Sequence, residues 1–321
     1  MNTFRKFTTL FYIFVFFYTF QLSANEKIAY LVSDIRIPFW EIMSKGIESK
    51  AKKLGYELSI YSADNIKKTE LENTIKAISS DVDALVISPI NSSTAVTILG
   101  FAKKANIPVV ISDIGTDAGE YLSFISSNNE QGGYAIGKVL TKQMKRLGWQ
   151  DGGVGIVSIP QKRKNGKART KGFLKALNED GIKNVGLHQQ VDFSYKETYD
   201  YSMQLIKENP NLKAIWLQGS DRYEGALDAI KDSGNLGEIL LLCFDAEPIF
   251  LELIPKGILV GSAMQQPFLM GEKAVEQIDR YLNGLKIAKE IKVDVLAISK
   301  ENIDEKISII KRNVLGLNKD E

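Results

Sequence analysis

Short apolar runs alternate with helical patterns along almost the whole chain of 321 residues. Several of these runs are nearly continuous Val, Ile and Leu, which is typical of strands covered by helices on both faces. The expected strands are Ile28–Val32, Glu57–Tyr61, Ala84–Ser88, Pro108–Ser112, Leu122–Ser126, Val154–Ile159, Val185–Gln190, Ala214–Gln218, Ile239–Phe244 and Leu259–Ala263. The repeated strand–helix order predicts an α/β fold of doubly wound parallel sheets.

The number of strands indicates two sheets. About ten strands approach the practical limit of one twisted open sheet, and the chain is long enough for two ordinary domains. We expect the change of sheet near Asn128 and Asn129, after the fifth strand. Helices are expected after Pro38 and at Thr69–Ser79, Thr94–Ala105, Gln131–Leu147, Arg169–Asn178, Tyr195–Glu208, Glu224–Ser233 and Gly271–Leu282.

The N-terminal segment has the pattern of a cleavable secretory signal peptide. Two basic residues, Arg5 and Lys6, precede the apolar run Phe7–Phe20, and small residues lead to an expected cleavage after Ala24. The run is short for a membrane span, which needs roughly 20 apolar residues, although an uncleaved anchor is the alternative. The only cysteine is Cys243, so we expect neither a lipid-anchored N-terminal cysteine nor an internal disulfide. Residues 1–24 therefore predict export to the periplasm.

The charge balance and the motifs of the sequence do not indicate a nucleic-acid-binding protein, an enzyme or a transcriptional regulator. Lys and Arg number 41 against 39 Asp and Glu, so the net charge of +2 does not indicate a nucleic-acid partner. The only histidine, His188, lies in an expected strand without a nucleophile motif beside it. The glycines of 152–155 precede a strand, whereas a dinucleotide loop follows one. We expect no catalysis, cofactor or metal, and a helix-turn-helix regulator is disfavoured because a signal segment stands at the N-terminus.

Six short motifs resemble, in order, those of the type I periplasmic binding proteins. This is the ribose-binding-like, sugar-binding superfamily, whose members are substrate-binding components of ABC transporters. The resemblance covers the chain from Lys27 to about Leu296. The motifs are the Pro-aromatic-aromatic step Pro38–Trp40, the turn Ser88–Asn91, the segment Asn106–Asp113, the lobe opening Asn128–Gly133, the Arg-x-x-Gly-Phe pattern Arg169–Phe173 and the strand end Cys243–Asp245.

The resemblance implies two lobes joined by a hinge of three segments. It places residues 25–128 and 266–294 in an N-terminal lobe, and residues 129–265 and 295–321 in a C-terminal lobe. It further implies a monomer that captures a small ligand, a sugar or sugar derivative, by hinge closure and delivers it to a membrane permease.

A cleft for a hydroxylated ring needs hydrogen-bonding groups and flat apolar walls. Carboxylates at strand ends can accept ligand hydroxyls, an arginine can bind two neighbouring hydroxyls, and aromatic rings can stack on C–H faces. For the two strand-end aspartates the alternative is helix capping, for the arginine a solvated charge in a basic loop over 162–169, and for the aromatics a core role. The candidate ligand-binding residues are Phe39, Trp40, Asp113, Arg169, Phe193, Asp221, Asp245 and Gln265.

Two positions depart from the polar pattern of the sugar binders. Ile37 stands where asparagine is frequent and Ile114 where arginine is frequent, so we expect a less polar pocket than a ribose site. An alternative function is a periplasmic sensor that signals to a membrane histidine kinase. In that hypothesis Trp40, Phe193 and Tyr223 enclose a methylated amine beside Asp113 or Asp221.

Overall fold

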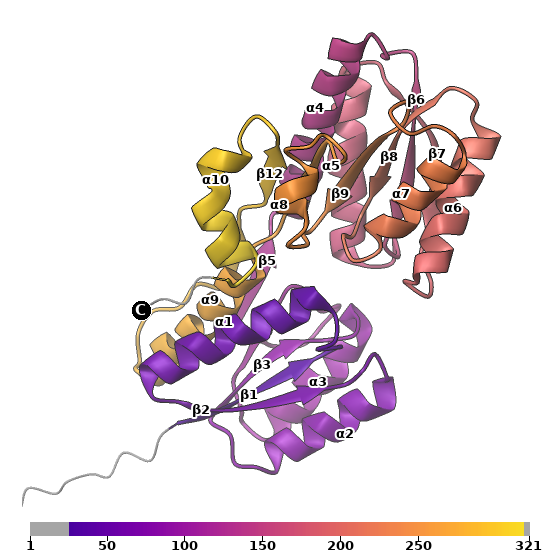
Figure 1. Ribbon diagram of the computed structural model, residues 1–321. Coiled ribbons are helices and arrows are strands. Elements are labelled where there is room, and N and C mark those ends of the chain that lie inside the picture. Colours follow the sequence, from indigo (N-terminus) through magenta and orange to yellow (C-terminus); the bar gives the residue numbers. More distant parts are fainter. Residues whose placement is uncertain (1–25, 318–321) are drawn as a thin grey trace, which may run out of the picture.

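Two α/β lobes form the part of the chain that the computed structural model describes, residues 26–317 (Figure 1). The predicted signal peptide lies outside these residues. The first lobe contains β1 (Lys27–Val32), α1 (Pro38–Leu54), β2 (Glu57–Ser62), α2 (Lys67–Ile78), β3 (Ala84–Ser88), α3 (Ser92–Lys104), β4 (Val109–Ser112), β5 (Ser123–Ser127), α9 (Pro267–Leu282) and β11 (Glu290–Val293). The second lobe contains α4 (Asn129–Leu147), β6 (Gly153–Ser158), α5 (Lys164–Glu179), β7 (Lys183–Gln189), α6 (Tyr195–Glu208), β8 (Leu212–Leu217), α7 (Tyr223–Asp232), β9 (Leu240–Phe244), α8 (Phe250–Leu253), β10 (Gly261–Met264), β12 (Leu296–Ser299), α10 (Ile303–Ile309) and η1 (Ile310–Val314).

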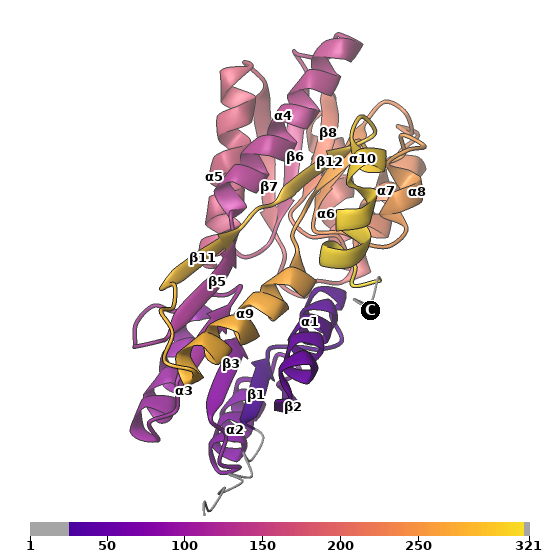
Figure 2. The same cartoon turned by 90° about the vertical axis from the view of Figure 1, so that its left-hand side faces the viewer.

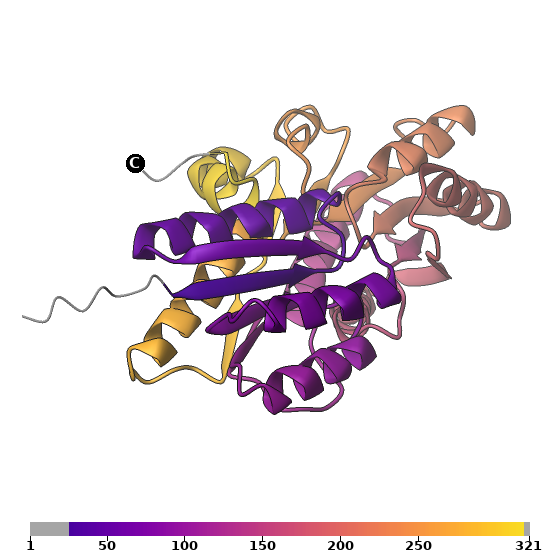
Figure 3. The ribbon, with the colours of Figure 1, turned by 90° about the horizontal axis from the view of Figure 1, so that it is seen from below.

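Each lobe is built on a six-stranded sheet covered on both faces. The strand orders are β11-β5-β4-β3-β1-β2 and β12-β10-β9-β8-β6-β7. Along β1, Ile28 and Tyr30 pack towards α1 and α9, while Ala29 and Leu31 pack towards α2 and α3. Figure 3 shows α1 on one face of this sheet and α2 and α3 on the other. The predicted fold class is confirmed.

One strand of the twelve runs against its neighbour. The pairing of β10 with β12 is antiparallel, whereas every other pairing is parallel. Only Asp294 and Val295 separate β11 from β12. The chain therefore leaves the first sheet at its carboxyl edge and enters the second sheet from the carboxyl edge as well, which reverses the strand direction (Figure 2).

The chain passes between the sheets at three places, which are β5 to α4, β10 to α9, and β11 to β12. Because β5, β10 and β11 each leave their sheet at the carboxyl end, the carboxyl edges of both sheets face the region between the lobes. Ligands of open α/β sheets bind at this edge. The topology thus places one candidate site between the lobes.

Two close helix pairs fix the elements that carry the site. In the pair α1 and α9, a Cβ at Gly46 would lie 2.1 Å from the carbonyl oxygen of Phe268. In the pair α4 and α5, a Cβ at Gly172 would lie 1.9 Å from the carbonyl oxygen of Glu130. Only glycine allows such backbone contact. The starts of α4 and α9 are therefore held firmly against their partner helices.

Helix α5 begins at Lys164, five residues before the expected start at Arg169. The run of charges suggested a loop, but the buried residues recur at helical spacing, namely Gly166, Arg169, Gly172 and Phe173. The lysines lie on the exposed face. Charged residues on one face do not prevent a helix whose other face is buried.

Candidate functional site

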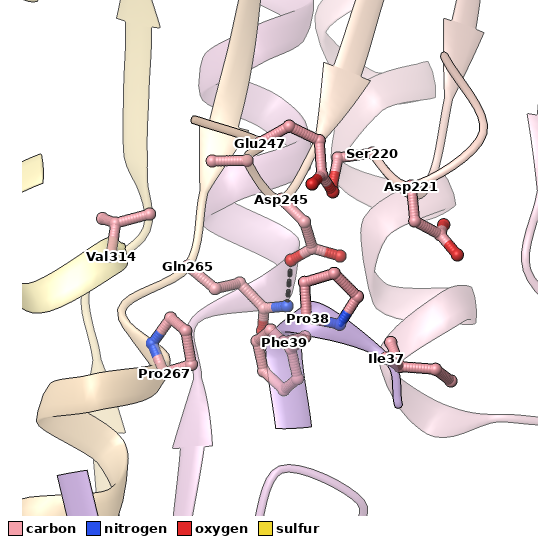
Figure 4. A pocket seen from close by; sticks show the side chains of 11 residues that line it. Ile37, Pro38, Phe39, Ser220, Asp221, Asp245, Glu247, Gln265, Pro267 and Val314 are labelled. Carbon is pink, nitrogen blue, oxygen red and sulfur yellow. Dashed lines mark hydrogen bonds between the residues drawn. The ribbon is translucent and has the colours of Figure 1, made fainter. Parts of the chain in front are cut away.

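A cavity of about 450 Å³ lies between the lobes, where the strands of both sheets end. All eight candidate residues line it, and so no predicted site residue lies elsewhere. Figure 4 shows its hinge side, where Phe39 from the start of α1 faces Asp245 and Gln265 of the second lobe. A volume of several hundred Å³ is typical of small-molecule sites, roughly 300–1,000 Å³.

Asp113 and Asp245 occupy equivalent positions in the two lobes. Each follows the last residue of a strand with a left-handed backbone, φ 67° for Asp113 and φ 69° for Asp245. Each amide continues the sheet, since Asp113 donates to Ile125 and Asp245 to Ala263. Neither caps a helix, because the next helices have other N-cap residues. The capping alternative is therefore wrong, and both carboxylates are directed into the cleft by strained turns.

Arg169 is held rigidly at the centre of the cleft. Its side chain is 4% exposed, Nε donates to Oδ1 of Asn129 at 2.8 Å, and Nη1 donates to the carbonyl of Gln218 at 2.8 Å. The guanidinium lies 3.9 Å from the ring centroid of Phe244, and Nη1 lies 3.5 Å from Oδ2 of Asp245. Arg169 is thus not a solvated surface charge. A guanidinium fixed in this way can donate to a ligand without first losing side-chain entropy.

The buried carboxyls of the cleft have too few hydrogen-bond and charge partners to offset their loss of hydration. Asp113 is 5% exposed and its Oδ1 has no hydrogen-bond partner. Burial raises its pKa to about 6, against the opposing effect of Arg169. Burial likewise raises the pKa of Asp245, whose Oδ1 accepts a hydrogen bond from Nε2 of Gln265. Unpartnered buried acceptors of this kind favour a ligand that brings hydrogen-bond donors.

The loop that carries Phe193 is organised by two side chains that the sequence analysis missed. The backbone amides of Val191, Asp192 and Phe193 all donate to the carboxylate of Glu197 in the first turn of α6. Arg222 donates from Nε to the carbonyl of Phe193 at 2.6 Å.

Arg222 also connects this loop to Asp221, with 3.0 Å between Nη1 and Oδ2 of that aspartate. Burial raises the pKa of Asp221 and Arg222 opposes this effect. Ser194 is the N-cap of α6 and its hydroxyl accepts from the amide of Glu197. The spacing Ser194-x-x-Glu197 matches the sequence pattern of a capping box, so this helix start could have been recognised in the sequence.

The aromatic residues do not form a closed cage. Trp40 is only 7% exposed and packs in the core of the first lobe, whereas Phe39 stands edge-on to it at 4.9 Å between centroids and is less buried. Tyr223 packs edge-on against Phe250 at 5.2 Å in the core of the second lobe. The ring surface offered to a ligand therefore comes mainly from Phe39 and Phe193.

Further residues of the cavity could not be found from the sequence alone. Asp34 accepts two hydrogen bonds from the guanidinium of Arg36 and one from Asn65. Arg163 lies 5.5 Å from the ring centroid of Phe193. Gln218 positions Arg169 through its backbone, which leaves no sequence signal.

Within residues 26–317, no grouping of three His, Cys, Asp or Glu side chains is suited to holding a metal ion. Cys243 is a free, buried thiol. No helix in that same range combines the length and the apolar character needed to cross a membrane.

Comparison with known proteins identifies relatives along most of the chain. The family described as periplasmic binding protein domain matches residues 28–286. The ribose import binding protein of Escherichia coli (strain K12) is 28% identical over 278 residues, which are 87% of this chain and 92% of the relative.

Two solved structures have a similar fold. A periplasmic solute-binding protein of Actinobacillus succinogenes 130z with bound D-allose has a TM-score of 0.79 at 24% identity, covering 88% of this chain and 100% of that one. A carbohydrate transporter solute-binding protein of Agrobacterium radiobacter in complex with D-arabinose has a TM-score of 0.82 at 22% identity, covering 91% and 99%.

Proposed function

Because the chain belongs to the periplasmic binding protein family, we propose that it captures a sugar or sugar derivative between its lobes and delivers it to the permease of an ABC transporter. The observation that carries this proposal is the polar centre of the cleft. The fixed guanidinium of Arg169 lines the cavity together with two carboxyls, Asp113 from the first lobe and Asp245 from the second, and its charge acts on both. This set supplies donors and acceptors for adjacent hydroxyls.

The ligand bridges the lobes in this proposal. Asp113 and Phe39 belong to the first lobe, whereas Arg169, Asp245 and Gln265 belong to the second. A ligand that contacts both sides binds the closed form better and so shifts the population towards closure. Relatives of this chain are named as import binding proteins. These names support a permease, in preference to a sensor kinase, as the membrane partner that binds the closed form.

The ligand class is tested by calorimetry with a panel of pentoses, hexoses and inositols, with trimethylamine oxide, betaine and choline as the rival set. We expect a carbohydrate to bind and the methylamines not to bind. Asp113→Asn should then weaken binding of that carbohydrate by about 10- to 100-fold, because a hydrogen bond to a charged group contributes about 1.5–3 kcal/mol.

Asp151→Asn, a change of an exposed aspartate outside the cleft, is the matched control. Binding of methylamines with no response to any carbohydrate would overturn the proposal.

We also propose that the mature protein begins at Asn25 and acts in the periplasm, supported by the segment Arg5–Ala24. Osmotic shock of expressing cells should release the protein, and N-terminal sequencing should give Asn25. Full-length protein confined to the membrane fraction would contradict this location.

A further inference from the structure

A second, smaller pocket of about 40 Å³ opens from the cleft on the hinge side of Phe39 (Figure 4). It has space for about one polar group of a ligand. Its lining residues are Ile37, Pro38, Phe39, Ser220, Asp221, Asp245, Ala246, Glu247, Gln265, Pro267 and Val314. Apolar side chains form one wall and oxygen-bearing side chains form the other.

The polar wall presents acceptors. Gln265 is 2% exposed and donates its Nε2 to Asp245, which leaves its Oε1 buried without a partner. Glu247 receives only the hydroxyl of Ser220, at 2.7 Å to Oε1. No Lys, Arg or His is among the residues that line this pocket. A ligand group that donates several hydrogen bonds would satisfy these acceptors.

The charge balance of the region is negative. Of the three arginines that line the adjacent cleft, Arg169 lies 3.5 Å from Asp245, Arg222 lies 3.0 Å from Asp221, and Arg163 lies against the ring of Phe193. Among the ion pairs of the described residues, none includes Glu247. Burial raises the pKa of Glu247 to about 7, and the charges of Asp221 and Asp245 add to this effect, while the hydrogen bond from Ser220 and the charge of Arg222 oppose it. A cation beside Glu247 would relieve this burial of negative charge.

We propose that this pocket is a subsite for a primary ammonium group carried by the sugar, so that the preferred ligand is an amino sugar. The inference rests on the proposed function and specifies its ligand. An ammonium has three donors and no acceptor, which matches Glu247, Asp221 and Gln265. A metal ion is a poorer match, since these carboxylates do not form a metal-binding group. A fully methylated amine has no N–H donor and would leave Gln265 unpartnered.

The test compares glucosamine, galactosamine and mannosamine with their neutral parent sugars and their N-acetyl derivatives, by calorimetry at pH 7. We expect at least one amine to bind about 10- to 100-fold more tightly than its parent, with the N-acetyl form not exceeding the parent. Glu247→Gln should weaken binding of the amine by about 10-fold or more and weaken binding of the parent sugar much less, so that the advantage of the amine disappears. Glu48→Gln, at an exposed position of α1 outside both cavities, should retain the advantage.

The outcomes separate the two proposals. Parent sugars that bind as tightly as the amines, or an equal loss for both in Glu247→Gln, would overturn the ammonium subsite and leave the sugar-binding function standing. Failure of every carbohydrate, amine or neutral, would overturn both. Circular dichroism of the Glu247→Gln protein establishes that a lost response does not come from unfolding.

Discussion

At the scale of single residues, Arg169 combines a structural and a binding role. Its guanidinium donates two hydrogen bonds to the protein and lies against the ring of Phe244. Its Nη1 is 3.5 Å from Oδ2 of Asp245, which is longer than a normal hydrogen bond. The two groups therefore do not form a full hydrogen bond with each other. A ligand hydroxyl placed between the two groups could accept from the arginine and donate to the carboxylate.

Arg169→Lys should weaken ligand binding by more than 10-fold and lower the free energy of unfolding by about 2–4 kcal/mol. A lysine cannot direct hydrogen bonds to both Asn129 and Gln218 in the planar geometry of the guanidinium, and it would leave buried polar groups unpartnered. Denaturant titration measures the stability and calorimetry measures the affinity. Lys171→Arg at the exposed face of α5 is the control. Wild-type affinity in Arg169→Lys would show that the guanidinium does not contact ligand.

The sequence predicted which side chains meet at the cleft better than it predicted their surroundings. Asp113 and Asp245 were recognisable because each follows an apolar strand, and the topology brings such positions together. The relative exposure of Phe39 and Trp40 was not predictable. Both lie in the first turn of α1, and the sequence does not show which of the two rings points into the core and which into the cleft. The partners of Arg169 depend on contacts between α4 and α5 that have no local pattern. The binding roles of the eight residues stay predictions.

At the scale of elements, the long strands and helices were predicted to within a few residues, and the short C-terminal ones were not. Strands β11 and β12 have four residues each, and β11 contains Glu290 and Lys292 at the edge of its sheet. Their strand character comes from pairing with β5 and β10 rather than from an apolar run. Helices α8 and α10 are likewise too short to give a periodic pattern.

The segment α10 and η1 connects the two lobes beside the hinge. Ile310 and Val314 are buried in the core of the second lobe. Arg312 of the same segment pairs with Glu272 of α9 at 2.9 Å, and Asn313 donates to Gln266 at 2.8 Å. The charged C-terminal region is therefore an integral part of the fold at least as far as these residues.

Ile310→Ala should lower the free energy of unfolding by about 2–5 kcal/mol, since Ile310 is 0% exposed and its truncation leaves a cavity. Leu317→Ala, at a side chain that is 55% exposed, should change it by less than about 0.5 kcal/mol. Urea unfolding followed by far-ultraviolet circular dichroism gives both values. Equal stability of the two variants would contradict the packing of this segment against the second lobe.

At the scale of the whole molecule, the burial of several carboxyls in the cleft makes their ionisation unfavourable. Burial raises the pKa of Asp113 to about 6 and of Glu247 to about 7, and it also raises those of Asp221 and Asp245. Ionising these groups in the unliganded protein costs stability, and a ligand with matching donors recovers part of that cost. A protein with such a cleft is less stable than one with an apolar cleft, but its carboxyls are already positioned to bind a polar ligand.

The stability of the unliganded protein should consequently fall as the pH rises from about 4.5 to 7.5. In the unfolded chain these carboxyls titrate near their ordinary values, about 4, so across this range the folded protein holds more protons than the unfolded one. The free energy of unfolding decreases with pH wherever that is so. The lowered pKa values of Asp34, beside Arg36, and of Asp180, beside Lys138, act in the opposite sense, but only below about pH 4.

Asp113 contributes most clearly, because its pKa moves from 3.8 to about 6 at a side chain that is 5% exposed. At about 1.4 kcal/mol per pKa unit, this group alone accounts for at most about 3 kcal/mol. Thermal melts of the ligand-free protein at half-unit pH steps measure the slope, and the double variant Asp113→Asn, Glu247→Gln should have a flatter profile. A stability that rises over this range, or a double variant with the wild-type slope, would mean that the cleft carboxyls are already compensated and that recognition does not depend on ligand donors.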